Sequence, residues 1–311
     1  MVKERRRALM DTLKVVVFEG VQNLPIFAAI ENGFFRDGDL EVNLTFTPDS
    51  QTLRSGLARG AFQIAHTAVD NAVAMVELAG DDVTVVMGGD NGFNSLVVQS
   101  PIEDVAQLRG KTVLVDAPNT AFALVLYKIL AIHGLGRGDY RVQPVGATPL
   151  RLERMVTDRD AAAAIMNLPF LIHGQRAGLR TVCRAVDVIG PYLSTAGFTL
   201  RGWARENSGI LIRYIRAYVE GLRWVVDPSR RRQAEGLLVT RLHLPADVAR
   251  EAYDRVIEGG GFMRDAAIDV AGFANVVALR AEIEGQWRGV PPIIDKYVDS
   301  SFHAAALQAI R

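Results

Sequence analysis

The sequence has a single cysteine, no net charge and no long apolar run. Cys183 is alone among 311 residues, which excludes an internal disulfide and a thiolate metal cluster. Because 35 Lys and Arg balance 35 Asp and Glu, no net electric field attracts a nucleic acid or an anionic membrane surface. Apolar stretches such as 161–166 are far shorter than the roughly 20 residues of a membrane-spanning helix. We therefore expect no nucleic-acid partner and no membrane span.

The N-terminus carries only part of an export signal. Lys3 and the arginines at 5–7 supply a basic start, but Asp11 follows soon afterwards, without an apolar core or a cleavage site. As written, this beginning predicts a cytoplasmic protein. A periplasmic location is the alternative, if a signal was removed or the start codon lies further upstream.

Signals for metal and phosphate binding are also scarce. The five histidines show no metal-ligand spacing. The glycine clusters at 88–89 and 259–261 lack the Lys-Ser/Thr pair of a phosphate-binding loop. We expect neither a metal nor a cofactor.

Short apolar segments alternate with helical patterns in the first part of the chain. The pattern predicts strands at 13–18, 40–46, 62–65 and 83–87, with helices at 25–33, 50–59 and 70–78. This order is typical of an α/β protein with a parallel sheet. Ligands bind outside the carboxyl ends of such strands, so the turns that follow them are where a site is expected.

A glycine-rich break at 88–92 separates this series from a second one. The second series predicts strands at 111–115, 141–144, 162–166 and 180–183, before a strand at 195–200 returns and long helical patterns follow from residue 209. We predict two lobes with a ligand cleft between them. Residues 1–92 and 197–311 would form the first lobe, residues 93–196 the second, with hinges at about 90–95 and 190–198.

Several segments resemble one family of bacterial proteins. They are residues 19–25, 31–35, 60–66, 108–113 and 197–200. They resemble the sulfonate, nitrate, taurine and thiamine-pyrimidine substrate-binding proteins of ABC transporters. The resemblance implies a type 2 periplasmic-binding-protein-like fold, a small polar or anionic organic ligand, and a permease and an ATPase as partners.

The same resemblance leaves an enzyme as the alternative. Cytoplasmic enzymes of similar fold act on small acids, so a decarboxylase, desulfinase or hydrolase of a small acid, aromatic acids included, fits the same pattern. In that case His66 would be the proton donor or base, oriented by Asp70, Glu19 or Asp116.

The loop after the first strand offers Glu19, Gln22 and Asn23. The family pattern turns this loop toward the cleft, where amide side chains hydrogen-bond a polar ligand of any charge. Glu19 would repel an anion and favour an amine or a hydroxyl. The alternative is an ordinary polar surface loop.

His66, Thr67 and Asp70 follow the third strand. His66 and Thr67 are candidates for ligand contact, although His66 also fits a satisfied histidine at the edge of a lobe. For Asp70 we favour a cap of the following helix.

The second lobe offers a matching turn with Asp116, Asn119 and Thr120. Side chains and helix N-terminal amides at this turn suit a carboxylate or sulfonate group, whereas the alternative is a capped helix with nothing bound. Phe122 is a candidate apolar wall.

Three further candidates lie at strand ends or at the hinge. Asn167 follows the buried strand at 162–166 and either contacts ligand or ties the loop. Asn91 and Phe93 lie at the presumed hinge, where they contact ligand between the lobes or serve the turn and the core.

Overall fold

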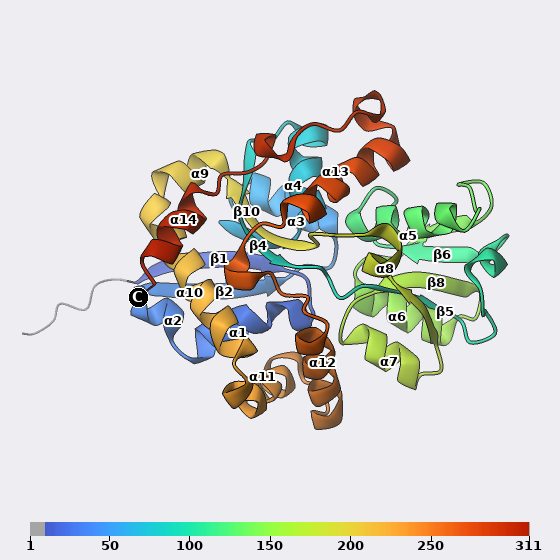
Figure 1. The fold of residues 1–311 in the computed structure, drawn as a ribbon, viewed down its shortest axis with the longest axis horizontal. Helices are drawn as coiled ribbons and strands as arrows, with labels where there is room; N and C mark the ends of the chain where they lie inside the picture. The colour runs from blue at the N-terminus through green and yellow to red at the C-terminus, as the bar shows by residue number, and fades with distance from the viewer. Residues whose placement is uncertain (1–9, 311) are drawn as a thin grey trace, which may run out of the picture.

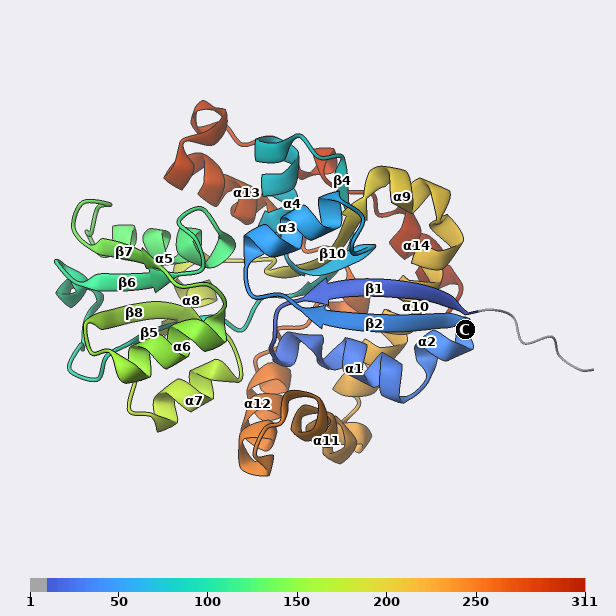
Figure 2. The same cartoon turned by 180° about the vertical axis from the view of Figure 1, so that it is seen from behind.

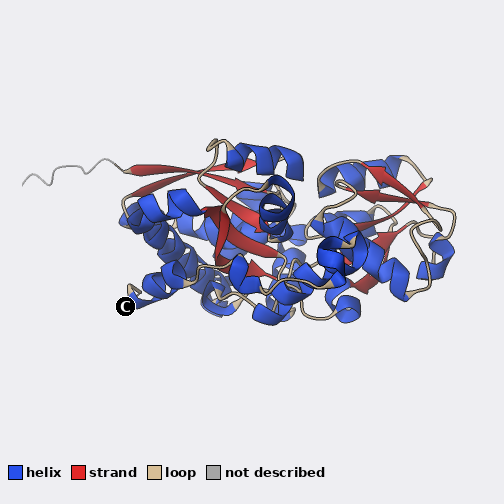
Figure 3. Cartoon of the chain, turned by 90° about the horizontal axis from the view of Figure 1, so that it is seen from above, coloured by secondary structure: helices blue, strands red, loops and turns tan. Residues whose placement is uncertain are grey.

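A computed structural model describes residues 10–310, which form two lobes around two separate five-stranded sheets. Figure 3 shows the two sheets side by side, each enclosed by helices. The two-lobed α/β fold predicted from the sequence is confirmed. The partial export signal at residues 1–9 lies outside the described residues.

The first sheet is built from strands of both ends of the first lobe. Its order is β2 (Leu40–Phe46), β1 (Asp11–Val17), β3 (Ile64–Ala68), β10 (Thr195–Leu200) and β4 (Val83–Asp90). β1 pairs in parallel with β2 and β3, with Val15 opposite both Leu44 and Ile64, whereas β10 runs antiparallel to β3 and β4. All eight residues of β4 are buried, as expected for a strand covered on both faces.

The second sheet repeats this arrangement. Its order is β7 (Arg141–Pro144), β6 (Thr112–Val115), β8 (Ala161–Met166), β5 (Ser95–Val98) and β9 (Arg180–Arg184). β6 is parallel to β7 and β8, and β5 is antiparallel to β8 and β9. Each lobe therefore brings the carboxyl ends of three parallel strands to one edge of its sheet.

The chain crosses between the lobes twice, and the two crossings lie side by side. The first connects β4 to β5, and the second connects β9 to β10. The backbone amide of Ser194 on the second donates to the carbonyl of Asp90 on the first at 2.9 Å, and that of Ala185 donates to Asn94 at 2.8 Å. The division into residues 1–92 with 197–311 and residues 93–196 stays a prediction, and sheet membership supports it.

Helices cover both sheets (Figures 1 and 2). In the first lobe they are α1 (Leu24–Glu31), α2 (Phe34–Asp37), α3 (Ser50–Ala58) and α4 (Asp70–Ala74), which a π-helical turn at Met75–Ala79 continues. In the second lobe they are α5 (Ala121–Ile132), α6 (Thr148–Thr157), α7 (Phe170–Arg176) and α8 (Ala185–Ile189). The C-terminal third contributes α9 (Arg201–Glu206), α10 (Ser208–Val226), α11 (Arg231–Leu242), α12 (Ala246–Glu258), α13 (Val270–Glu284) and α14 (Ser301–Gln308).

The C-terminal helices pack on both lobes. In α10, a Cβ at Gly221 would lie 2.3 Å from the carbonyl oxygen of Pro25, so the backbones of α10 and α1 touch. Figures 1 and 2 place α12 and α13 on opposite sides of the junction between the lobes. From α12, Asp247 pairs with Arg176 of α7 at 2.6 Å, while α13 packs against α5.

One buried ion pair joins three of these segments. The guanidinium of Arg280 on α13 donates to both carboxylate oxygens of Asp70 at 2.5 and 2.7 Å, and also to the carbonyl of Asn119 at 3.0 Å. Both side chains of the pair are almost completely buried. The prediction that Asp70 caps the following helix is wrong, because Val69 occupies the cap position and the Asp70 carboxylate binds Arg280 instead.

We predict that Arg280→Met strongly destabilises the protein. The substitution leaves the Asp70 carboxylate buried without its cation, which typically costs about 3–5 kcal/mol of unfolding free energy. Denaturant unfolding followed by circular dichroism measures this loss. Glu282→Gln, on the same helix, breaks a half-exposed pair with Lys128 and should change stability by no more than about 1 kcal/mol. Equal losses in the two variants would contradict a special role of Arg280.

Candidate functional site

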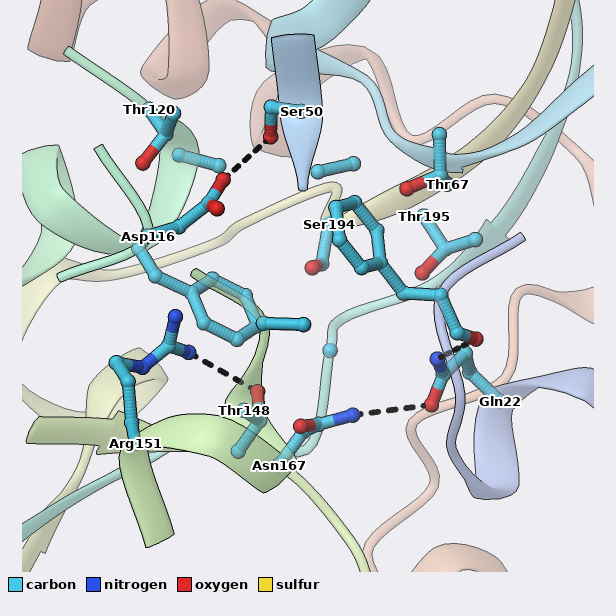
Figure 4. A pocket seen from close by; sticks show the side chains of 16 residues that line it. Gln22, Ser50, Thr67, Asp116, Thr120, Thr148, Arg151, Asn167, Ser194 and Thr195 are labelled. Atoms are coloured by element: carbon cyan, nitrogen blue, oxygen red, sulfur yellow. Dashed lines mark hydrogen bonds between the residues drawn. The ribbon is translucent and has the colours of Figure 1, made fainter. Parts of the chain in front are cut away.

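A cavity of about 60 Å³ lies between the two lobes. Side chains of both lobes surround it, as Figure 4 shows. The polar and charged lining residues are Gln22, Ser50, Thr67, Asp116, Thr120, Thr148, Arg151, Asn167, Ser194 and Thr195, with Phe18 and Phe122 among the apolar ones.

Most of these polar groups follow the carboxyl end of a parallel strand. In the first lobe, Gln22 follows β1, Ser50 follows β2 and Thr67 lies at the end of β3. The second lobe repeats the pattern with Asp116 after β6, Thr148 after β7 and Asn167 after β8. The two halves of the fold thus present equivalent edges to one cavity, where ligands of such sheets bind.

The lobes touch directly around the cavity. The Ser50 hydroxyl donates to a carboxylate oxygen of Asp116 at 2.6 Å, and the Asn167 amide donates to the Gln22 side-chain oxygen at 3.2 Å (Figure 4). Backbone bonds add to these contacts, because the Ala147 amide donates to the carbonyl of Pro48 at 3.0 Å. These bonds join one lobe to the other, so the structure is a closed form.

Arg151 on α6 is the buried cation of the site. Its guanidinium donates to the carbonyl of Gly146 at 2.6 Å, the hydroxyl of Thr148 at 2.9 Å and the carbonyl of Ile165 at 3.2 Å. Burial lowers the pKa of Arg151 to about 10, against the opposing effect of the Asp116 carboxylate, so the guanidinium stays charged at neutral pH. The sequence interpretation missed this residue.

The structure brings half of the predicted binding residues to the cavity. Gln22, Thr67, Asp116, Thr120, Phe122 and Asn167 line it. Their role in binding stays a prediction.

Six other predicted residues lie outside this lining: Glu19, Asn23, His66, Asn91, Phe93 and Asn119. The Asn23 amide donates to the carbonyl of Phe18 at 2.7 Å, and the Asn119 carbonyl accepts from Arg280. Asn91 and Phe93 line a separate pocket, together with Arg255 and Glu258 of α12.

His66 and Thr67 are neighbours on β3, and successive side chains of a strand point to opposite faces. Thr67 therefore reaches the cavity, while the His66 ring packs against Tyr218 of α10, with ring centres 4.5 Å apart. Burial lowers the pKa of His66 to about 3, so its imidazole is neutral across the physiological range. This position does not suit a group that exchanges protons with a ligand.

Residues missed by the sequence interpretation complete the lining. Besides Arg151, these are the polar residues Ser50, Thr148, Ser194 and Thr195, the aromatic Phe18, and the small residues Ala68, Gly92, Ala121 and Ala147. Ser50 and Thr148 begin helices directly after strands β2 and β7, a position that could have identified them.

Among residues 10–310, no group of three or more His, Cys, Asp or Glu side chains is placed to hold a metal ion. No helix in that range is both long and apolar enough to cross a membrane.

Comparison with known proteins gives one family and one fold. The sequence model of the family described as NMT1/THI5 like matches residues 21–230. No curated protein matches the chain.

Solved structures match over nearly the whole chain. The periplasmic nitrate-binding protein NrtA of Synechocystis PCC 6803 is 14% identical, with a TM-score of 0.79 over 97% of this chain and 89% of that one. The alkanesulfonate-binding protein SsuA of Xanthomonas axonopodis pv. citri, bound to MOPS, is also 14% identical, with a TM-score of 0.72 over 93% and 98%. The desulfurization enzyme DSZB is 16% identical, with a TM-score of 0.69 over 97% and 100%. These likenesses confirm the periplasmic-binding-protein-like fold.

Ser50→Ala should shift the protein toward an open form. The substitution removes the hydrogen bond to the charged Asp116, a kind of bond that typically contributes about 1.5–3 kcal/mol. Small-angle X-ray scattering of the ligand-free protein should show a larger radius of gyration. Ser55→Ala, on the same helix α3, removes only a local bond to Thr52 and should leave the scattering unchanged. An unchanged radius in both variants would contradict the interlobe role of Ser50.

Two buried groups near the hinge give opposite pH dependences of stability. Burial raises the pKa of Asp90 to about 7, whereas it lowers that of His66 to about 3. Between these pH values Asp90 stays protonated in the folded protein but is ionised in the unfolded chain. Its contribution to the free energy of unfolding is therefore present at low pH and is lost as pH rises toward 7. In the folded protein His66 does not bind the proton that it binds in the unfolded chain. Its contribution to the free energy of unfolding is therefore present above about pH 6.5 and is lost as pH falls.

We therefore predict that Asp90→Asn makes stability rise more steeply between about pH 4 and 6.5, by at most about 1.4 kcal/mol per pH unit. His66→Asn should change the slope in the opposite direction. Urea unfolding at several pH values across this window measures both slopes. If both variants shift the slope in the same direction, this assignment of the two groups is wrong.

Proposed function

The chain belongs to the NMT1/THI5-like family, and we propose that it is the substrate-binding component of an ABC import system, holding one small polar or anionic organic molecule between its lobes. One observation carries this proposal: polar side chains at the strand ends of both lobes converge on a single interlobe cavity. The nitrate-binding and alkanesulfonate-binding proteins of similar fold support it.

In this proposal, binding is coupled to closure. A ligand that enters the open cleft meets Thr67 and Gln22 of the first lobe, and then Asp116 and Asn167 of the second as the lobes approach. Closure forms the Ser50–Asp116 and Gln22–Asn167 bonds around it. The two side-by-side crossings near Asp90 and Ser194 provide the hinge.

The proposed partners are a membrane permease and its ATPase, and the proposed location is the periplasm. The nitrate-binding protein of similar fold is periplasmic by name. The cytoplasmic location expected from the N-terminus has no support among the similar proteins.

Catalysis is the second candidate function, because the desulfurization enzyme DSZB has a similar fold. Its expected residues fit poorly. His66 is neutral and packs on Tyr218, Asp70 is bound by Arg280, and Glu19 lies outside the cavity lining. Asp116 alone of the expected set lines the cavity. This arrangement favours binding over chemical conversion.

The test begins with native mass spectrometry of protein purified from its own host, to recover the bound molecule. Incubation of that molecule with the protein should return it unchanged. Conversion of the molecule, with the rate lost in Asp116→Asn, would instead establish an enzyme.

The recovered molecule also tests the site. Thr67→Val removes a buried hydroxyl of the cavity and should weaken its affinity by roughly tenfold, because one hydrogen bond contributes about 1 kcal/mol or more. Thr84→Val removes a similarly buried hydroxyl on β4, outside the cavity, and should leave affinity unchanged. Isothermal titration calorimetry measures both. An unchanged affinity in Thr67→Val would place the ligand elsewhere.

A further inference from the structure

We infer that the cavity selects a ligand that both donates and accepts hydrogen bonds, of the class of small amine-bearing acids, over a simple oxyanion. The inference rests on the proposed binding function and narrows its ligand. It follows from the charges of the lining, the orientation of one amide and the buried polar atoms that have no partner.

The lining contains one cation and one carboxylate. Arg151 has no carboxylate within 4.0 Å in the part of the chain that the structure describes, and the acid that acts on its charge is Asp116. An anion bound beside Arg151 therefore also meets the negative field of Asp116. A ligand with a cationic group toward Asp116 and an acidic group toward Arg151 satisfies both.

The orientation of Asn167 follows from a chain of hydrogen bonds that starts at a backbone carbonyl. The Phe18 carbonyl can only accept, so Gln22 must turn its amide nitrogen toward it, at 3.1 Å. The Gln22 side-chain oxygen then faces Asn167, which must donate to it through its own amide nitrogen, at 3.2 Å. The oxygen of Asn167 is left as an acceptor.

Two acceptor atoms of the second lobe thus lack a partner among residues 10–310. They are the Asn167 side-chain oxygen and the Asp116 oxygen Oδ1, while Oδ2 of Asp116 accepts from Ser50. Buried acceptors without a donor are costly, so a bound molecule that supplies N–H groups is favoured. Nitrate and alkanesulfonate ions have none.

Unpaired donors belong to the same lining. The Thr67 hydroxyl of the first lobe and the Arg151 Nε atom of the second have no partner among the described residues. The oxygen atoms of an acidic group on the ligand would accept hydrogen bonds from both donors. Acceptors and donors together call for a molecule with a group of each kind.

Calorimetric titration of the full chain with three related probes tests the inference. β-Alanine carries both groups, propionate lacks the amine and ethylamine lacks the carboxylate. We expect β-alanine to bind at least about tenfold more tightly than either of the others. Asp116→Asn should reduce the advantage of β-alanine over propionate to less than about threefold, because the carboxylate partner of the ammonium is gone.

Asp160→Asn is the matched control, since it removes an exposed carboxylate of the same lobe, outside the cavity, and should preserve the preference. Thermal unfolding confirms that both variants fold. Propionate or nitrate binding as tightly as β-alanine would overturn the inference and leave the binding function intact. Failure of all three probes to bind would also contradict the inference. The proposed binding function is tested separately, and it fails if the protein purified from its host carries no ligand.

Discussion

The guanidinium of Arg280 fixes the relation between parts of the chain that are far apart in sequence. It binds Asp70, at the start of α4, and the backbone of Asn119, just before α5. One buried cation therefore positions α13 against both lobes and sets the loop from which Thr120 reaches the cavity. Because both charges of the pair are withdrawn from water, the arrangement holds only with this geometry intact.

The two lobes share the same arrangement of strands. In each sheet three parallel strands end at the cleft, and the strand that arrives from the other lobe runs antiparallel to its neighbours. This repetition explains why Ser50 and Thr148 occupy equivalent positions, and why the cavity is polar on two sides. A site built in this way requires no dedicated loop insertion, because the ends of ordinary βα units supply its groups.

The order of strands and helices could be predicted from the sequence because it depends on local apolar periodicity. The side chains that reach the cavity could not all be predicted, because they depend on which face of an element is turned inward. Thr67 and His66 are adjacent, and only the register of β3 sends one to the cavity and the other to Tyr218. Likewise Arg151 and Arg154 lie on the same helix, yet Arg151 is buried whereas Arg154 pairs with Asp158 at the surface.

The paired crossings between the lobes have a mechanical consequence. Two connections side by side, tied together by the bond from Ser194 to Asp90, permit rotation about one axis while they resist twisting and sliding. Two connections that are tied together in this way leave one axis of rotation between the lobes. The lobes therefore approach along one path, and the same pairs of side chains, Ser50 with Asp116 and Gln22 with Asn167, meet each time the cleft shuts.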